Sequence, residues 1–385
     1  MSDLTPDKYT YYDVDGLARV KSRVRLPELD SFRTRSSTGQ PDLIIEVRPM
    51  VKGAPAPVVP PSYRYREWMG FITANFDVTM GPPAVVSAAP LLALSRHVLY
   101  TNVVEPLLRF IVASRGRMLV HAGCVVLGGQ GVMLSARTDT GKTATILRLL
   151  RSSGGSFLSD DMTILAPSGE ASRYAKPLTI SAHTLRAVPH NRLRAGQRAA
   201  LAVQSRLHSR SGRGVGKWLG ERPLPIMALN SAVQAVIPPP KYRVDQLVPC
   251  QLGRTTKVSK LFLIERGSPP LRAEVPQEEA LEQLLVNTAD AYEFPPFRTM
   301  APKLRVGGLD FEEVQAAERA VLREALAHIE IVRLRVADFS WPELVKAALA
   351  REQTEPVGAV ATAGGWGPAE PMVAAAGLLS AQEDT

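Results

Sequence analysis

The stretch between His121 and Asp161 constrains the fold of this chain more than any other. The apolar run 132–134 predicts a buried strand, and the segment 143–151 has the apolar spacing of a helix. Between them, residues 136–143 fit the pattern x-x-x-x-x-Gly-Lys-Ser/Thr, with alanine where glycine usually begins it. This order of strand, loop and helix predicts a concave site for a di- or triphosphate, lined by backbone N–H groups and the positive end of the helix.

The whole loop is therefore a candidate contact surface for a nucleotide. Lys142 would reach the outer phosphates, and the Thr143 hydroxyl would ligate Mg²⁺. Asp139 is unexpected, because an acid in a phosphate cradle repels the nucleotide unless it turns outward or helps to bind the metal. The candidate nucleotide contacts are Ala136, Arg137, Thr138, Asp139, Thr140, Gly141, Lys142 and Thr143.

Two neighbouring acids follow the loop. Asp160 lies 18 residues beyond Lys142, at the end of a short apolar strand, and Asp161 comes next. Because neighbouring strand residues point to opposite faces, both can reach one site only where the strand ends. One carboxylate can then hold the metal while the other accepts a proton from an incoming hydroxyl.

This segment resembles the HPr kinase/phosphorylase-like kinases, relatives of the phosphoenolpyruvate carboxykinase nucleotide-binding fold. The resemblance rests on a His-Ala-Gly start at His121, 21 residues before Lys142, on the Gly-Lys-Thr loop and on the Asp-Asp pair. It covers residues 100–180 well and residues 5–350 more loosely. It implies a mixed α/β fold, in which a β-rich N-terminal lobe precedes a P-loop core.

The resemblance also implies roles for the site residues. Asp160 is implied as the base on the acceptor hydroxyl, Asp161 as the residue that assists the metal with Thr143, and His121 as their neighbour. Lys142 completes the predicted catalytic set. The Gly-rich stretch by which HPr kinases hold their protein substrate is not evident, which puts HPr itself in doubt as the substrate.

Length and pattern predict the organisation of the chain. At 385 residues with 45% hydrophobic residues, it is long enough for one large or two ordinary domains. We expect a β-rich lobe at 1–100, a kinase-like domain at 101–352 and a disordered, Ala-, Gly- and Pro-rich tail at 353–385. Strands are expected at 8–14, 18–26, 42–47, 173–181, 260–265 and 332–336, and helices at 106–116, 278–292, 311–329 and 341–351.

The basic charge of the chain is concentrated in one segment. Residues 183–222 hold nine Lys or Arg against the single acid Glu221, while the whole chain has a net charge of +9. Such a concentration favours a polyanionic or phosphorylated acceptor or an acidic membrane surface; a solvated basic helix face explains it equally well. Nucleic acid is not expected, because stacking aromatics are missing there apart from Trp218. The candidate acceptor contacts are Lys176, Arg210, Arg213, Lys241 and Arg243.

The cysteines, the N-terminus and the apolar runs of the sequence exclude some classes of protein. The two cysteines, Cys124 and Cys250, exclude a disulfide framework, and we expect Cys124 to be a buried, inert thiol. The N-terminus lacks the form of a signal peptide, and no run approaches about 18 apolar residues. A cytoplasmic location is the expectation.

The predicted function is an ATP- and Mg²⁺-dependent kinase. It would transfer the γ-phosphate to a hydroxyl of a small, anionic acceptor such as a sugar or sugar phosphate. A serine kinase of a protein or peptide is the close alternative. Ala136 and Asp139 also permit a non-catalytic nucleotide-binding regulatory protein, and the basic segment permits a protein that docks on an anionic membrane. The sequence leaves open ATP against GTP, any phosphorylase activity and the oligomeric state.

Overall fold

The computed structural model describes residues 9–36, 39–50, 62–70, 72–137, 140–180, 184, 225–239 and 241–354. The chain forms two compact units, residues 1–346 and 347–385, and all the sheets lie in the first. Several predictions lie outside the described residues: loop positions Thr138 and Asp139, candidate contacts Arg210 and Arg213, and the tail beyond residue 354.

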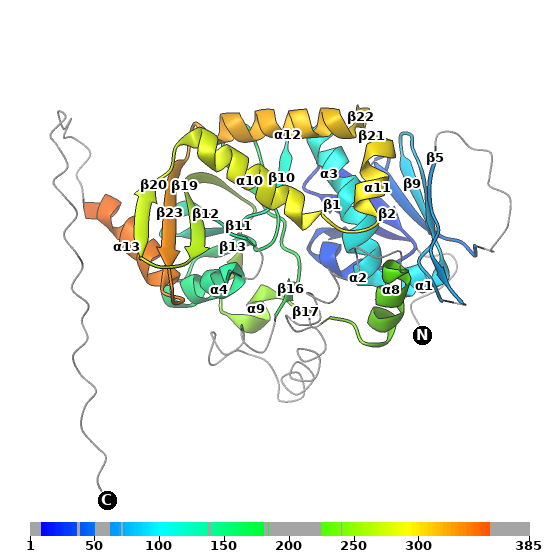
Figure 1. Cartoon of the computed structure of the whole chain (residues 1–385), viewed down its shortest axis with the longest axis horizontal. Coiled ribbons are helices and arrows are strands. Elements are labelled where there is room, and N and C mark those ends of the chain that lie inside the picture. The colour runs from blue at the N-terminus through cyan, green and yellow to red at the C-terminus, as the bar shows by residue number, and fades with distance from the viewer. Residues whose placement is uncertain are drawn as a thin grey trace, which may run out of the picture. The chain divides into compact units, whose positions relative to one another are not determined.

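The N-terminal part of the first unit is a sheet of seven described strands (Figure 1). Buried and partly exposed residues alternate along β2 and β9, so one face of this sheet lies against a core. The strands are β1 (Thr10–Val14), β2 (Ala18–Ser22), β3 (Arg33–Thr34), β4 (Leu43–Val47), β5 (Ser62–Tyr65), β8 (Phe76–Thr79) and β9 (Ala84–Ala88), in the order β3-β1-β2-β4-β9-β8-β5.

The 3-10 helix η1 (Pro27–Phe32) lies between β2 and β3 of the first sheet. Four helical segments then lead from β9 to the second sheet: α1 (Pro90–Leu94), α2 (Arg96–Leu99), the π-helical turn η2 (Tyr100–Val104) and α3 (Glu105–Ser114). Leu107, Phe110 and Ile111 of α3 share one buried cluster with Val20, Ile45 and other residues of the first sheet.

The second sheet contains ten strands within the described part of the chain. β12, β19 and β23 run parallel, and β19 lies between the other two. The strands are β10 (Met118–Val120), β11 (Gly123–Leu127), β12 (Gln130–Ser135), β13 (Ser156–Ser159), β14 (Thr163–Leu165), β15 (Glu170–Ser172), β18 (Gln251–Leu252), β19 (Thr255–Arg266), β20 (Leu271–Glu274) and β23 (Glu330–Val336). Their order is β10-β14-β15-β19-β12-β11-β13-β18. β23 and β20 lie outside this order: β23 pairs with β19, and β20 pairs with β23.

Helices lie on both sides of the second sheet. In Figure 1, α10 (Gln277–Ala291) and α12 (Phe311–Leu326) lie above the strands and α4 (Lys142–Ser153) lies below them. Leu281 and Leu322 of the upper helices pack with Leu261 and Leu263 of β19. A capping box at Asp310 and Glu313 begins α12.

The remaining elements are short, apart from two longer helices. They are β6 (Trp68–Met69), β7 (Ile72–Thr73), β16 (Leu178–Thr179), α8 (Ile226–Val236), β17 (Lys241–Tyr242), α9 (Val244–Leu247), α11 (Phe297–Met300), η3 (Ala301–Lys303), β21 (Arg305–Val306), β22 (Leu309–Asp310) and α13 (Trp341–Thr354). In the described ranges, no helix combines the length and the apolar character needed to cross a bilayer.

The mixed α/β class is confirmed, and the expected helices are present as α3, α10, α12 and α13. The predicted strand at 173–181 is wrong in its length, since only Leu178 and Thr179 pair with β17. The preceding residues leave the ladder because the Tyr174 N–H donates to Leu158 O and Pro177 has no N–H to donate. Cys124 is a buried free thiol, and burial raises its pKa to about 12.

The residues of strand β10 belong to two different buried clusters, and the candidate site begins directly after this strand. Met118 and Val120 belong to the cluster beneath α10 and α12, while Leu119 belongs to the cluster of the first sheet. This alternation follows from the period of two along a strand. His121 is the next residue, so its position is determined by both clusters.

Candidate functional site

The loop between β12 and α4 depends on a glycine. Gly141 precedes α4 with a φ of +126°, a conformation that side-chain-bearing residues rarely adopt. A Cβ at this position would come within 3.0 Å of Phe339 Cε1 and 3.2 Å of Trp341 Cζ3. A side chain at position 141 would therefore strain this entry into α4.

The N-terminus of α4 presents backbone donors. The first N–H groups of a helix have no partner within the helix, and no side chain caps α4 at Gly141. The hydroxyl of Thr140 instead donates to Arg137 O at 2.8 Å, and that of Thr145 donates to Gly141 O at 3.0 Å. Ala136 is buried. An anion is favoured at this helix end because the free N–H groups and the helix dipole both point toward it.

Lys142 carries the least satisfied group of the site. Its Nζ is buried and has no hydrogen-bond partner among the described residues, and the same holds for Asp160 Oδ1. Burial lowers the pKa of Lys142, although the negative charges of Asp161 and Asp160 oppose this effect. An ammonium in such a place needs an anionic partner.

Asp160 lies against the start of α4. The Thr143 hydroxyl donates to Asp160 Oδ2 at 2.7 Å. Burial raises the pKa of Asp160, while the charge of Lys142 and the hydrogen bond from Thr143 act in the opposite direction. A carboxylate with a raised pKa accepts a proton more readily at neutral pH than an ordinary aspartate does.

Asp161 faces a different set of partners. Lys176 Nζ donates to Asp161 Oδ2 at 2.7 Å, and His121 Nε2 lies 3.5 Å from Asp161 Oδ1. Enclosure by the protein raises the pKa of Asp161, but the positive charge of Lys176 outweighs it and holds that pKa well below its usual range. Asp161 is therefore ionised at neutral pH, and 54% of its side chain is exposed.

His121 is neutral and fixed in orientation. Its backbone N–H donates to Thr288 Oγ1 at 3.0 Å, and its Nδ1 lies 2.9 Å from the carbonyl oxygen of Asn287. Because a carbonyl can only accept, Nδ1 carries the proton and Nε2 presents a lone pair toward Asp161. Burial and the charge of Lys142 lower the pKa of His121 to about 4. Nε2 and the Asp161 carboxylate are thus two neighbouring acceptors, each able to take a hydrogen bond from an O–H or N–H donor.

A buried hydrogen-bond network also holds Lys176 in place. Its Nζ also donates to Glu105 Oε1 at 2.7 Å, and the Tyr100 hydroxyl donates to the same oxygen at 3.2 Å. The hydroxyls of Tyr100 and Tyr174 are 2.5 Å apart. Sequence reasoning missed Glu105, Tyr100, Tyr174 and Asn287, because no motif marks them and they come from distant segments.

The structure does not bring every predicted residue to this place. His121, Lys142, Thr143, Asp160, Asp161 and Lys176 lie together around the start of α4. Lys241 instead pairs with Glu28 and His97. Arg243 donates to Asp245 at 2.7 Å in an exposed pair beside α9.

The residues present fit a magnesium ion bound mainly by other groups. The described part of the chain contains no cluster of three or more His, Cys, Asp or Glu placed to hold a metal. Mg²⁺ typically uses one or two carboxylates, and completes its shell with phosphate oxygens and water. The Thr143 hydroxyl and the carboxylates of Asp160 and Asp161 meet that requirement, and the unpartnered Asp160 Oδ1 is available to it.

The sequence matches no protein-family model and no curated protein. Among solved structures, the chain is similar to the Hpr(Ser) kinase/phosphatase from Coxiella burnetii, with 10% sequence identity and a TM-score of 0.22, over 60% of this chain and 94% of that chain. This TM-score is too low to indicate a shared fold or function. The geometry of the site is the basis for inferring a function.

Proposed function

We propose that this protein is a nucleotide-dependent phosphotransferase that moves the terminal phosphate of ATP to a hydroxyl group of a small acceptor. The observation that carries the proposal is the buried, unpartnered Nζ of Lys142 at the N-terminus of α4. A polyphosphate would supply the anionic partner that Lys142 lacks, and its oxygens would accept from the free N–H groups of the helix. The loop 136–143 would hold the nucleotide.

Two neighbouring acids, whose pKa values are shifted in opposite directions, support phosphate transfer rather than nucleotide binding alone. We assign Asp160 as the base, because its raised pKa favours proton uptake. We assign Asp161 with Thr143 to Mg²⁺, because Asp161 stays ionised. Asp160 also contacts Thr143, so it lies within reach of the same ion. The ion would neutralise charge on the transferred phosphate and on the leaving diphosphate.

The proposed reaction is an in-line displacement at the γ-phosphorus of ATP. The acceptor hydroxyl gives its proton to the Asp160 carboxylate as its oxygen bonds to the γ-phosphorus. The bond between that phosphorus and the β,γ-bridging oxygen breaks, and ADP leaves with the electron pair. The Nε2 lone pair of His121 can accept a hydrogen bond from a second hydroxyl of the acceptor or from water, and so orient it.

The proposal is tested by transfer of label. Full-length protein is incubated with Mg²⁺, γ-labelled ATP and a fractionated metabolite extract, beside Lys142→Ala and Asp160→Asn. We expect label in a small-molecule fraction, with a loss of at least about 100-fold in both variants. Label in a protein fraction would support a protein kinase instead.

If wild-type protein binds nucleotide but labels neither extract nor added proteins, the phosphotransferase proposal fails. A regulatory nucleotide-binding protein then replaces it. If wild-type protein binds no nucleotide, the role of Lys142 is overturned as well.

A further inference from the structure

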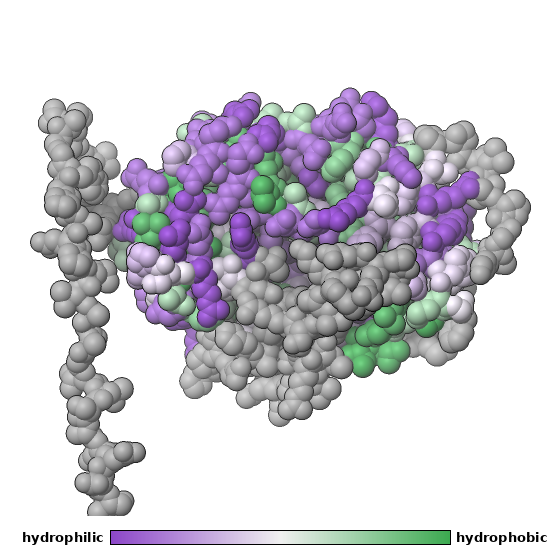
Figure 2. Space-filling view, viewed as in Figure 1, coloured by the Kyte–Doolittle hydropathy of each residue, from purple (hydrophilic) through white to green (hydrophobic). Residues whose placement is uncertain are grey.

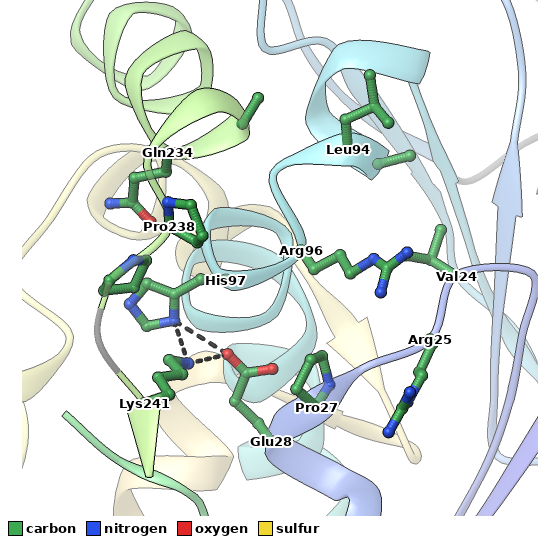
Figure 3. A pocket seen from close by; sticks show the side chains of 13 residues that line it. Val24, Arg25, Pro27, Glu28, Leu94, Arg96, His97, Gln234, Pro238 and Lys241 are labelled. Atoms are coloured by element: carbon green, nitrogen blue, oxygen red, sulfur yellow. Dashed lines mark hydrogen bonds and ion pairs between the residues drawn. The ribbon is translucent and has the colours of Figure 1, made fainter. Parts of the chain in front are cut away.

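A cavity of about 330 Å³ lies outside the cluster around Asp160 (Figure 3). It is lined by residues of η1, α1, α2, the end of α8 and β17. Val24, Pro27, Leu94 and Pro238 line it with apolar surface. Its polar lining residues are Arg25, Glu28, Arg96, His97, Gln234 and Lys241.

Glu28 is the buried polar group of this cavity. It is only 2% exposed, and its Oε1 accepts from Lys241 Nζ and lies 3.0 Å from His97 Nδ1. Its Oε2 is buried without a hydrogen-bond partner among the described residues. Figure 3 shows this second oxygen on the side of the carboxylate away from Lys241. A buried acceptor left unsatisfied is costly, so the site is incomplete without a donor.

The charge of Glu28 specifies the kind of donor. Burial opposes ionisation, but the hydrogen bond to His97 and the charge of Lys241 lower the pKa of Glu28 to about 2. At neutral pH the group is a carboxylate, which can only accept. The partner that it lacks must therefore offer an O–H or N–H group.

The surrounding cations discriminate between these donors. Lys241, Arg96 and Arg25 all line the cavity, and Arg25 also donates to Asp30 at 2.8 Å. With the Glu28 carboxylate counted, the charged lining residues keep a net positive charge, which disfavours a cationic amine relative to a neutral hydroxyl. A second, anionic group on the same ligand would be attracted by the guanidinium groups.

The cavity is electrostatically coupled to the candidate active site. β17, which carries Lys241, pairs with β16, and Thr179 lies opposite Lys241 three residues beyond Lys176. The positive charge of Lys176 contributes to lowering the pKa of both His97 and Lys241. Figure 2 shows an apolar area over α8, whose exposed large hydrophobic residues are Leu229, Val233 and Val236.

We propose that this cavity binds a hydroxylated small molecule that also carries an anionic group, such as a sugar phosphate or a sugar acid. The proposal rests on the unpartnered Glu28 oxygen, on the cations and on the volume of the cavity. A ligand hydroxyl donates to Glu28 Oε2, and the anionic group lies near Arg96 and Arg25. The proposal does not depend on phosphoryl transfer, because binding is measured without nucleotide.

Isothermal titration of the full-length protein tests it with five probes: ribose 5-phosphate, gluconate, ribose, inorganic phosphate and ethanolamine. We expect saturable 1:1 binding of ribose 5-phosphate or gluconate, at least tenfold tighter than binding of ribose or phosphate. Ribose 5-phosphate alone would indicate a phosphate ligand, and gluconate alone a carboxylate. Ethanolamine should not bind.

Two variants locate the binding. Glu28→Gln should weaken the preferred probe at least tenfold, and Ala235→Phe should abolish binding by filling the cavity from α8. Lys142→Ala should leave the affinity unchanged. Near-ultraviolet circular dichroism checks each fold, and Ala235→Phe decides the matter if Glu28→Gln is misfolded. The proposal is overturned if neither anionic probe binds, if ethanolamine binds best, or if folded Glu28→Gln and Ala235→Phe bind as wild type does.

Discussion

At the scale of single residues, the site is defined by groups whose charge is poorly compensated. Lys142 Nζ and Asp160 Oδ1 are both buried without partners among the described residues, although they lie in the same site. Neither atom stabilises the fold in this arrangement, because each has lost its water without gaining a hydrogen bond. Residues that lower the stability of the fold and lie at a helix terminus indicate that a ligand binds there.

Replacement of Lys142 should separate stability from binding. Lys142→Met retains most of the side-chain volume and removes the buried cation, so the free energy of unfolding should rise by about 1–3 kcal/mol without nucleotide. ATP affinity should fall at least about 100-fold. Urea unfolding and nucleotide titration measure both effects, with the exposed Lys303→Met as the matched control. Lower stability in Lys142→Met would contradict the view that this ammonium is unsatisfied.

The two acids should differ in their effects. Asp160→Asn should lower kcat by about 10²–10⁴-fold but weaken Mg²⁺-dependent nucleotide binding less than Asp161→Asn does, because the base is lost while Asp161 still holds the ion. Asp161→Asn should instead raise the Mg²⁺ concentration needed for half-maximal binding. Titration of Mg²⁺ at fixed nucleotide, beside single-turnover transfer, distinguishes them. The reverse pattern would exchange the two assignments.

His121 should make stability depend on pH. Its pKa is about 4 in the folded protein, against 6.5 for an unperturbed histidine, so between these values the unfolded chain binds the extra proton. Stability contributed by neutral His121 is complete above pH 6.5 and is lost as the pH falls toward 4. Between pH 7 and pH 5 the loss should be about 2 kcal/mol. Urea unfolding in metal-free buffer measures it, and His121→Gln should show a smaller change over the same interval. An equal change in both proteins would exclude His121 as the cause.

At the scale of elements, the turn from β12 into α4 depends on the packing of a distant segment. Phe339 and Trp341 lie against Gly141, so the loop conformation is supported by residues about 200 positions later in the chain. Arg148 of α4 also donates to Phe339 O at 2.8 Å. The segment that precedes α13 therefore helps to hold the helix terminus in place.

Gly141→Ala should disrupt this turn for two reasons. The positive φ is strained for alanine, and the added Cβ meets two aromatic rings. The free energy of unfolding should fall by about 2–4 kcal/mol, and nucleotide binding should be lost. Gly129→Ala is the matched control, because Gly129 also has a positive φ but an added Cβ meets nothing within 4 Å. Equal destabilisation of the two variants, measured by thermal unfolding, would show that the rings are not in tight contact.

At the scale of the whole first unit, a buried ion pair joins α3 to α12. Arg109 Nε and Nη2 donate to the two oxygens of Glu318 at 2.7 and 2.6 Å, and both side chains are almost inaccessible. The guanidinium also lies over the ring of Tyr292, 4.7 Å from its centroid. This pair connects the helix that covers the first sheet with the helix that covers the second.

Loss of one partner should cost more than loss of both. Glu318→Ala leaves an uncompensated buried charge and should lower the free energy of unfolding by about 3–5 kcal/mol. The double variant Arg109→Met, Glu318→Leu should recover most of that loss, because it removes both charges and conserves volume. Urea unfolding of the wild type and the two variants measures both changes. If the double variant is the least stable, the pair contributes net stability rather than specificity.

Local pattern was enough to predict many of these elements. Apolar spacing predicts α4, α10 and α12, and alternation predicts β1, β2 and β23, because burial of one face imposes a period on each segment. The Gly-Lys-Thr loop could be located for the same reason, since it requires a strand before it and a helix after it. The Asp160–Asp161 pair was expected at the end of a strand, and β13 ends at Ser159.

What only the tertiary structure decided is which of these residues meet. Glu105 and Lys176 are 71 positions apart and carry no shared motif, yet they form one buried pair beside Asp161. Lys241 looked equivalent to Lys176 in the sequence, but the ladder between β16 and β17 places it with Glu28 in a separate cavity. Periodicity along a chain reports which face of a segment is buried, whereas the partner on that face depends on the packing of all the others.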